Sequence, residues 1–441
     1  MKTPEIKSLI IPANSVEIYN KFEIVLDLDA SYANPYDYEE ILVQANFKGP
    51  SGEEKQVDGF FMQDFKLDHS TGGLTALEHG TFKIRFAPTE TGQWSFWISV
   101  KDKNGSTHSE AQVFQCTPVA QDFNEGFVRR TTTNYLQYDT DAPVFLVGEN
   151  MAWHGTNPYL DYKLWLTELS NNGGNFIRLW HAHWGLGIEW TAARKGFDGL
   201  GRYNQENCFY QDWLFDFCTE KGIVIMLTFQ HHGPFSSKVD SNWDENPYNS
   251  SNGGPCIKPI DFFSKQAALS FTRNRYRYIL ARWGYARSIL AWELFNEVDW
   301  IDDLDEHLVT VFQWHSTMAT FLKQLDPNQH LVSTSFDDEH KADRIWRDQN
   351  IDIVQIHHYE AKPNIERSLV DLLQKALKTY QKPVLIAEFS LGTKAEELWI
   401  DPEGIHMHNV LWASTFGGGI GTAMTWWWDI YIHPKNLYRY F

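Results

Sequence analysis

The stretch Ile289–Trp300, which reads ILAWELFNEVDW, constrains the fold of this chain more than any other. It opens as a continuous apolar run, and a strand that is buried on both faces has this composition. Polar groups then arrive together without a turn signal, at Asn296, Glu297 and Asp299. Parallel α/β sheets and barrels bury their strands on both faces and bind ligands at the carboxyl ends of those strands. The stretch therefore predicts a parallel α/β fold with a functional site where this strand ends.

A second stretch has the same construction. The apolar run Val384–Ala387 ends directly in Glu388. Two buried strands thus each deliver one glutamate at the carboxyl end. A pair of carboxylates can divide acid and base work when their surroundings separate their pKa values, as in the hydrolysis of glycosidic bonds. Glu297 and Glu388 are the candidate catalytic residues.

The strand-like segments of the second part of the chain alternate with amphipathic helical patterns, such as Tyr159–Ser170. Eight βα units over about 300 residues predict a TIM barrel. About three βαβ units of about 30 residues separate Glu297 from Glu388, which assigns them to strands four and seven. Few residues follow Trp428, so we expect a very short last helix or a chain shorter than the natural protein. The eight expected strands are Val144–Val147, Asn175–Trp180, Ile223–Phe229, Ile289–Phe295, Leu331–Ser335, Ile353–Ile356, Val384–Ala387 and Thr422–Trp426.

The N-terminal part of the chain has a different pattern. Apolar and polar residues alternate with period two between turn signals, for example from Phe22 to Asp29, which predicts antiparallel strands with one buried face. Residues 1–118 are therefore expected to form an immunoglobulin-like β-sandwich. Residues 119–139 contain the strand-like Gly126–Thr133 instead of a Gly/Ser tether, so we expect a connection packed between the domains. The barrel domain is expected over residues 140–441.

Composition excludes several classes of function. The net charge of −19 argues against nucleic acid as a partner, because phosphate contact requires a basic patch. No apolar run approaches the roughly 18 residues of a membrane span, and the N-terminus lacks a signal-peptide core. We expect a cytoplasmic protein, or a secreted one whose signal was removed. The four cysteines form no CxxC pair and the glycines form no nucleotide-binding pattern, so no structural zinc and no cofactor is expected.

Further polar and aromatic residues stand where the predicted strands end. Arg178 would hold a carboxylate ionised through a charge-assisted hydrogen bond, and Tyr359 could donate to the same carboxylate. Asn296 could bind a sugar hydroxyl beside the scissile bond. Tryptophans offer flat apolar faces to a sugar ring and N–H groups to its hydroxyls. The candidate substrate-binding residues are Arg178, His231, His232, Asn296, His357, Tyr359, Trp426 and Trp428.

This set of residues resembles the retaining glycosidases of clan A, most nearly glycoside hydrolase family 5, over about residues 140–430. The segments NPYDYEE and APTETGQW resemble the β-sandwich that precedes such barrels in some bacterial members. The resemblance implies a retaining β-glycoside hydrolase that acts on a β-linked oligo- or polysaccharide without a cofactor, with Glu297 as acid/base and Glu388 as nucleophile. The other candidates would line the sugar site, with the choice within the paired histidines and within Trp426–Trp428 left open.

Two other hypotheses compete with that of a retaining glycosidase. A catalytically silent carbohydrate-binding protein would use the cleft and its tryptophans alone. A metal-dependent barrel hydrolase would use the histidines, for example His181 and His183, although no HExxH motif is present. The retaining mechanism requires carboxyl groups about 5–5.5 Å apart. It also predicts that Arg178 and Tyr359 keep Glu388 charged, while Glu297 stays protonated to a higher pH. Sugar identity, linkage, endo or exo action and oligomeric state stay open.

Overall fold

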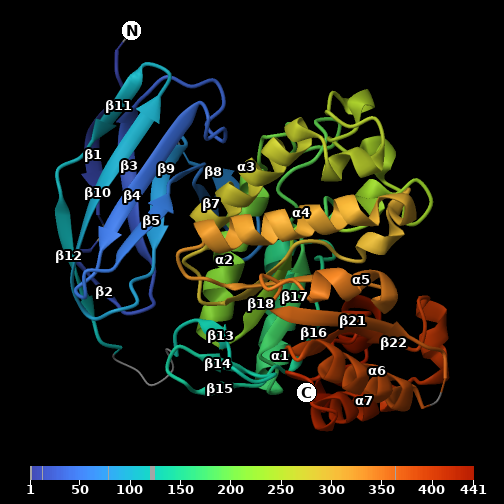
Figure 1. The fold of residues 1–441 in the computed structure, drawn as a ribbon. Coiled ribbons are helices and arrows are strands. Elements are labelled where there is room, and N and C mark those ends of the chain that lie inside the picture. The colour runs from blue at the N-terminus through green and yellow to red at the C-terminus, as the bar shows by residue number, and fades with distance from the viewer. Residues whose placement is uncertain (1, 12, 78, 120–124, 363) are drawn as a thin grey trace.

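The computed structural model describes residues 2–11, 13–77, 79–119, 125–362 and 364–441. It has two main parts, an all-β N-terminal domain and a parallel sheet surrounded by helices (Figure 1). Within the described residues, none of the helices combines the length and apolar character that crossing a membrane requires.

Two packed sheets form the N-terminal domain. One sheet has the order β1-β3-β9-β6, and the other has the order β2-β12-β10-β4-β5 with β11 paired to β10. Their alternating apolar residues meet in an aromatic core, where Phe47 stacks on Phe86 with ring centroids 4.0 Å apart. The strands are β1 (Glu5–Ile10), β2 (Ser15–Glu17), β3 (Phe22–Asp29), β4 (Ile41–Lys48), β5 (Glu54–Asp58), β6 (Phe60–Met62), β9 (Thr81–Phe86), β10 (Gly92–Asp102), β11 (Gly105–His108) and β12 (Gln112–Thr117).

A small antiparallel sheet follows the sandwich. It comprises β13 (Val128–Arg130), β14 (Leu136–Tyr138) and β15 (Pro143–Val144). Its apolar side chains pack in one cluster with residues of the barrel strands, among them Leu290 and Leu331. This sheet covers part of the expected connection 119–139, of which residues 120–124 lie outside the described part of the chain.

The second domain is a nearly closed parallel barrel. Seven strands run side by side in chain order, and helices surround them (Figure 1). Residues 420–425 close the ring through the isolated bridges Leu146↔Gly421, Glu149↔Thr425 and Phe389↔Thr425. The strands are β16 (Gly148–Asn150), β17 (Phe176–Trp180), β18 (Val224–Thr228), β19 (Ile289–Glu293), β20 (Leu331–Phe336), β21 (Ile353–Tyr359) and β22 (Val384–Ser390).

Two expected strands are corrected by the structure. The first barrel strand is β16, because Pro143–Val144 pairs with β14 instead. The eighth segment, expected as Thr422–Trp426, makes isolated bridges rather than a strand. At both places a glycine lets two backbone segments lie close together. A Cβ on Gly148 would lie 1.7 Å from the carbonyl oxygen of Phe176, and one on Gly421 would lie 2.2 Å from that of Leu146.

Within the described residues, seven α-helices and several short helical turns accompany the barrel strands. The described segment after Trp427 forms two short turns. The α-helices are α1 (Pro158–Asn171), α2 (Gln205–Lys221), α3 (Gln266–Trp283), α4 (Leu304–Leu325), α5 (Glu339–Trp346), α6 (Ile365–Tyr380) and α7 (Ile405–Phe416). The turns are Gly233–Phe235, Trp243–Glu245, Ser250–Asn252, Pro259–Phe263, Val298–Trp300, Ala395–Ile400, Trp428–Ile432 and Leu437–Tyr440.

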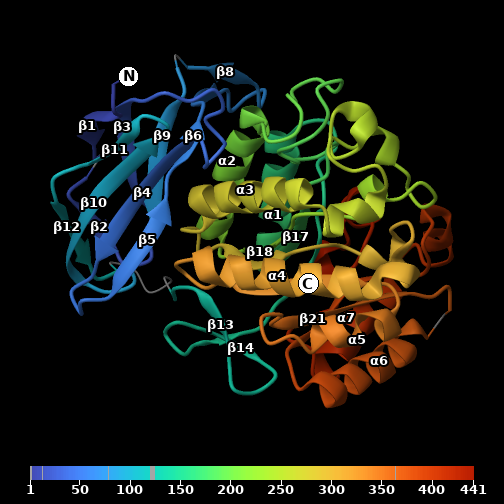
Figure 2. The same ribbon diagram turned by 45° about the horizontal axis from the view of Figure 1, so that its top comes forward.

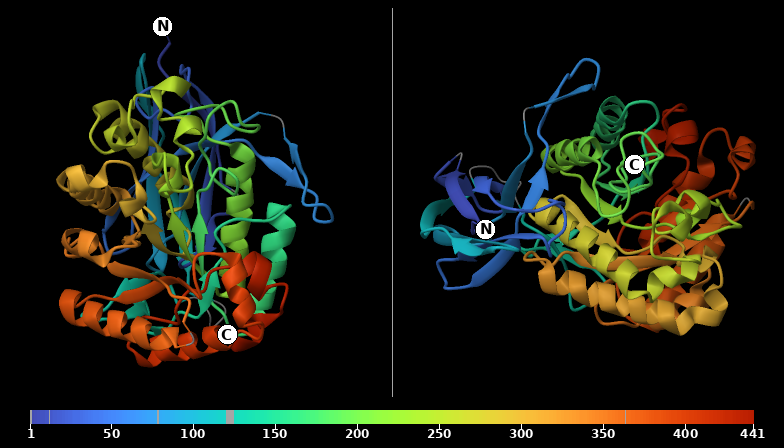
Figure 3. Two further views of the ribbon diagram at one scale, coloured as in Figure 1. Left: turned by 90° about the vertical axis from the view of Figure 1, so that its right-hand side faces the viewer. Right: turned by 90° about the horizontal axis from the view of Figure 1, so that it is seen from above.

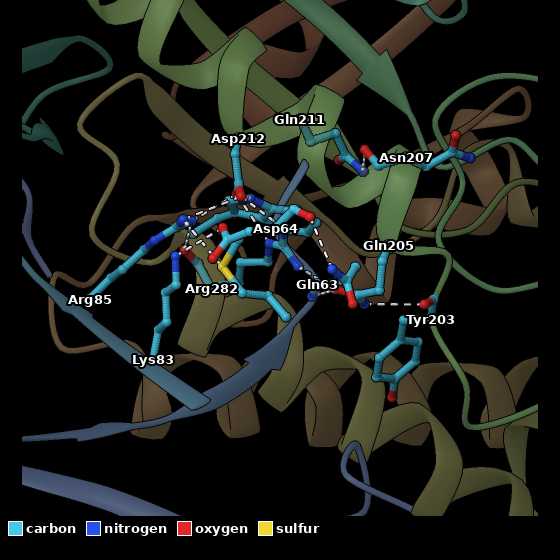
Figure 4. A network of polar contacts seen from close by, with 12 residues as sticks. Gln63, Asp64, Lys83, Arg85, Tyr203, Gln205, Asn207, Gln211, Asp212 and Arg282 are labelled. Atoms are coloured by element: carbon cyan, nitrogen blue, oxygen red, sulfur yellow. Dashed lines mark hydrogen bonds and ion pairs between the residues drawn. The ribbon is translucent and has the colours of Figure 1, made fainter. Parts of the chain in front are cut away.

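The sandwich packs against the barrel through α2 and α3. Helix α3 lies against β5, β6 and β9 (Figure 2). A hairpin of β7 (Phe65–Leu67) and β8 (Leu74–Ala76) projects from the sandwich (Figure 3), and the hydroxyl of Tyr210 on α2 donates to the carbonyl of Gly72 at its tip over 2.6 Å. Where the sandwich meets these two helices, Asp212 of α2 accepts hydrogen bonds from Arg85 of β9 and Arg282 of α3 (Figure 4).

Candidate active site

Arg178, on β17, organises the centre of the barrel mouth. Its guanidinium is fully buried and binds Glu293 in a bidentate pair, with Nε 2.6 Å from Oε2 and Nη2 2.7 Å from Oε1. Its Nη1 donates to Oε1 of Glu388 over 2.5 Å. Nη2 also donates to Oδ1 of Asn296 over 2.6 Å. One guanidinium thus fixes three of the side chains around it, as its planar array of donors allows.

Glu388 ends the inward row of β22 and has a donor on each oxygen. Arg178 faces Oε1, and the hydroxyl of Tyr359 donates to Oε2 over 2.5 Å. Burial raises the pKa of Glu388, and His357, Arg178 and the Tyr359 hydrogen bond act in the opposite direction. Desolvation of this buried carboxyl therefore outweighs its donors in the direction of the shift. The expectation that Arg178 and Tyr359 keep Glu388 charged stays a prediction.

Glu297 follows β19 in a left-handed conformation with φ of 47°. Its backbone N–H donates to Oγ of Ser335 over 3.1 Å, which helps to fix this uncommon geometry. The carboxyl lies 2.7 Å from Nδ1 of His357 and 3.6 Å from Nδ1 of His232. Burial raises the pKa of Glu297 to about 7, as expected for a carboxyl that keeps its proton near neutral pH.

The two glutamates face each other across the mouth. One oxygen of Glu297, one of Glu388 and a ring nitrogen of His357 all lie within 4.8 Å of one another. Among the described residues this trio has the spacing of a metal site, whereas His181 bonds to Gln211 and His183 stacks on Trp190. Hydrogen-bond donors already face both oxygens of Glu388, and a guanidinium lies 2.5 Å away. These groups stabilise a negative charge on Glu388, and the nearby guanidinium would repel a metal cation bound at the trio.

The adjacent histidines after β18 have different neighbours. His231 forms an isolated bridge with Asn296 and stacks on Trp180 with ring centroids 5.3 Å apart. Burial lowers the pKa of His231 well below its ordinary value, so its imidazole is neutral. His232 instead faces Glu297 and Asp240. Both histidines therefore lie at the mouth, and His232 is the one that reaches a catalytic candidate.

Tryptophans gather around Trp153 and reach His231 through Trp180 and Trp184. Trp153 makes edge contacts with Trp180, Trp184, Trp426 and Trp428. Trp426 is partly exposed, whereas Trp428 is 1% exposed and lies against Trp153 and Trp426. Of the two tryptophans predicted to bind substrate, Trp426 can therefore offer its ring to a ligand. Trp428 is buried and packs against Trp153 and Trp426.

Sequence reasoning missed two residues of this network. Glu293 is fully buried on β19, where it accepts from Arg178 and from Oγ1 of Thr228 over 2.7 Å. Asn150, on β16, accepts from Nη1 of Arg178 over 3.2 Å and donates to the carbonyl of Ala387 over 2.9 Å. A charged residue inside an apolar strand requires a buried partner, so Glu293 carried a signal that could have been used.

Known proteins resemble both parts of the chain. A family model described as "Domain of unknown function (DUF5060)" matches residues 15–101, within the sandwich. Two relatives from Arabidopsis thaliana, "Putative mannan endo-1,4-beta-mannosidase 4" and "Putative mannan endo-1,4-beta-mannosidase P", are each 22% identical over 359 residues, which span 69% of this chain and 83% of theirs.

Solved structures extend the comparison to the fold. A crystal structure described as a "putative glycoside hydrolase" from Bacteroides vulgatus matches 93% of this chain and 72% of its own, with a TM-score of 0.64 at 19% identity. A glycoside hydrolase family 5 mannosidase from Rhizomucor miehei matches 69% of this chain and 86% of its own, with a TM-score of 0.52 at 16% identity. The first likeness spans the sandwich and the barrel, and together they establish a TIM-like barrel behind an all-β domain.

Proposed function

We propose that this chain is a retaining β-glycoside hydrolase of the clan A type, with Glu297 as acid/base and Glu388 as nucleophile. The observation that carries the proposal is the approach of the two carboxyls, each contributing an oxygen to a group within 4.8 Å. A nucleophile that touches the anomeric carbon leaves no room for water, which limits a retaining pair to about 5–5.5 Å, against about 6.5–9.5 Å for an inverting pair.

The first step breaks the glycosidic C–O bond. Glu297, whose pKa of about 7 leaves a large fraction of it protonated near neutral pH, donates its proton to the leaving oxygen. Glu388 attacks the anomeric carbon through one carboxylate oxygen and forms a glycosyl ester. Arg178 and Tyr359 hold the carboxylate oxygens in place, so the attack requires little rearrangement.

The second step hydrolyses the ester. Glu297 is now a carboxylate and removes a proton from water, whose oxygen attacks the same carbon as Glu388 leaves. Two inversions give net retention. The sugar is released as a β-hemiacetal and both glutamates return to their starting protonation states.

The named relatives guide the choice of the first substrate. The two plant relatives carry mannan endo-1,4-β-mannosidase names, and the family 5 neighbour is described as a mannosidase. We therefore propose a β-mannan or β-manno-oligosaccharide as the substrate to test first. The partly exposed Trp426, whose backbone N–H donates to the carbonyl of Phe389 next to Glu388, supports a sugar ring as the ligand.

Glu388→Ala tests this function directly. It should abolish release of reducing sugar from β-manno-oligosaccharides, and azide should restore turnover with formation of an α-glycosyl azide. Glu245→Ala, an exposed residue of the loop after β18, is the matched control and should keep full activity. Proton NMR of the first product should show the β-anomer. An initial α-anomer, or activity that survives Glu388→Ala, would reject the mechanism, and binding without turnover would favour a carbohydrate-binding protein.

A further inference from the structure

A chain of three polar side chains runs from solvent to the acid/base candidate. Asp240 lies 3.2 Å from Nε2 of His232, and Nδ1 of the same ring lies 3.6 Å from Oε2 of Glu297. The side chain of Asp240 is 80% exposed, whereas those of His232 and Glu297 are 8% and 12% exposed. The outer carboxylate is therefore in water while the imidazole it contacts is in the protein.

The loop after β18 fixes the position of Asp240. Its backbone is in a left-handed conformation with φ of 45°. The backbone N–H of Asn242 donates to the carbonyl of Gly233 over 2.9 Å and closes the loop. A Cβ on Gly233 would lie 2.7 Å from the carbonyl oxygen of Asp240, so a glycine is needed where the loop passes over itself. The contact with His232 follows from this closed geometry.

We propose that Asp240 is a positioning residue for Glu297 and acts through His232. The carboxylate of Asp240 accepts the Nε2 proton of His232 and turns Nδ1, also protonated, toward Glu297. An imidazolium then stands beside the acid/base and stabilises its carboxylate after the proton has been given to the leaving group. The inference rests on the proposed glycosidase function and adds to it a residue outside the sugar site.

The surrounding charges are consistent with a cationic His232. Burial lowers the pKa of His232, but the hydrogen bond to Asp240 and the negative charges of Glu297, Asp240 and Glu388 raise it overall. On the other side of Glu297, burial lowers the pKa of His357, which favours its neutral ring, and Nδ1 of that ring lies 2.7 Å from Oε1 of Glu297. The charged and titratable groups around Glu297 are His232, His357, Glu388, Asp337, Arg178, Asp240, Asp299 and Tyr359.

The direction in which one substitution shifts the pKa of Glu297 separates an effect that acts through His232 from a direct effect of the Asp240 charge. Asp240→Asn removes a negative charge, which taken alone would lower the pKa of Glu297. Through His232 the effect is the reverse, because the ring loses its partner and then its proton, and Glu297 loses its nearest cation. His232 acts on Glu297 more strongly than Asp240 does. We therefore expect Asp240→Asn to raise the pKa of Glu297 by about one unit.

Carboxyl NMR measures this shift without requiring turnover. Protein labelled with [5-13C]glutamate is titrated, and the Glu297 signal is assigned by its loss in Glu297→Gln. The pKa of Glu297 should rise in Asp240→Asn and stay unchanged in Asp244→Asn, an exposed aspartate of the same loop. In a His232→Gln background, Asp240→Asn should no longer raise it. An unchanged or lowered value in Asp240→Asn, or the same rise in both backgrounds, would overturn the proposal.

Kinetics supply a second readout. With an aryl β-mannoside, the basic limb of kcat/KM should move up in Asp240→Asn by the shift seen in NMR, and Asp240→Glu should restore the wild-type limb. A fall in kcat with an unmoved limb would indicate a merely structural role and would reject the relay. Failure of the wild-type protein to cleave any β-glycoside would reject the proposed function, and the NMR titration would still decide whether Asp240 controls Glu297.

Discussion

Replacing Asp212 by Asn should uncouple the sandwich from the barrel. The carboxylate of Asp212 lies between Arg85 of β9 and Arg282 of α3, with 2.7 Å contacts to both (Figure 4). It also accepts from Nε1 of Trp283 over 2.7 Å. The Arg282 side chain is fully buried, so an uncharged partner would leave its guanidinium in the protein interior without compensation.

The expected loss of stability is about 3–5 kcal/mol, the usual cost of removing one partner from a buried ion pair. Arg85 keeps Glu23 as a second partner, with Nε 2.7 Å from Oε2, which places the expectation toward the lower end of that range. Asp216→Asn is the matched control, because Asp216 on the same helix also joins the domains through Lys21, at 2.6 Å, but its side chain is 50% exposed. An exposed pair of this kind contributes about 0–1 kcal/mol.

The dependence on pH gives a further check. The two guanidinium groups outweigh burial and hold the pKa of Asp212 below its ordinary value of 3.8. A carboxyl with a depressed pKa in the folded protein contributes stability that is present above its unfolded pKa and is lost as the pH falls toward the folded pKa. The difference between wild type and Asp212→Asn should therefore be full at pH 7 and shrink below pH of about 4.

Urea unfolding followed by tryptophan fluorescence and far-UV circular dichroism measures these differences, and calorimetry shows whether the two domains melt together. We expect one cooperative transition for the wild type and a lower midpoint for Asp212→Asn. The reasoning is refuted if Asp212→Asn costs less than about 1 kcal/mol at pH 7, or no more than Asp216→Asn does. Independent melting of the two domains in the wild type would also count against coupling through Asp212.

Two further substitutions have expected outcomes. Glu149→Gln should stabilise the protein increasingly above pH of about 4.5, because burial raises the pKa of Glu149 in the folded state. The free energy of unfolding of the wild type should fall by about 1.4 kcal/mol per pH unit until the carboxyl ionises in the folded protein. Urea unfolding should therefore show equal stability of the two proteins at pH 4 and a clear difference by pH 8. Tyr359→Phe should lower kcat about 100-fold and move the acid limb of kcat/KM upward, because Glu388 loses a donor that lowers its pKa; an unmoved limb contradicts that role.

Most of the barrel could be predicted from sequence because both faces of its strands are buried. Continuous apolar runs such as Ile289–Trp292 and Val384–Ala387 indicate strands buried on both faces, and both runs lie in strands of the structure, β19 and β22. The ring closure was harder to predict. Leu146, Gly148 and Gly421 meet through backbone approaches that depend on missing side chains, and such contacts leave no periodic pattern in the chain.

Predicting the site from strand ends found the candidate residues and two partners of Glu388, Arg178 and Tyr359, but it missed Glu293. Tyr359 ends β21 and Glu297 follows β19, whereas Arg178 and Glu388 lie within β17 and β22. All four are close to the carboxyl edge of the barrel, so their convergence follows from the fold. Glu293 is the last residue of β19 but stands among apolar residues in the sequence, and it pairs with Arg178 of β17. That partnership depends on register between separate strands, which the sequence of either strand alone does not contain.

The different surroundings of the two glutamates explain why one fold can give them different roles. Burial raises the pKa of both, so desolvation does not distinguish them. Their partners distinguish them, because Glu388 contacts a guanidinium and a phenol, whereas Glu297 contacts two imidazoles. His357 and Tyr359 stand two residues apart on β21 and so share the inward face, yet the first bonds to Glu297 and the second to Glu388. One strand thereby supplies each carboxyl with a separate hydrogen-bond partner, and in the proposed mechanism Glu297 is the carboxyl that gives up the proton and later regains it.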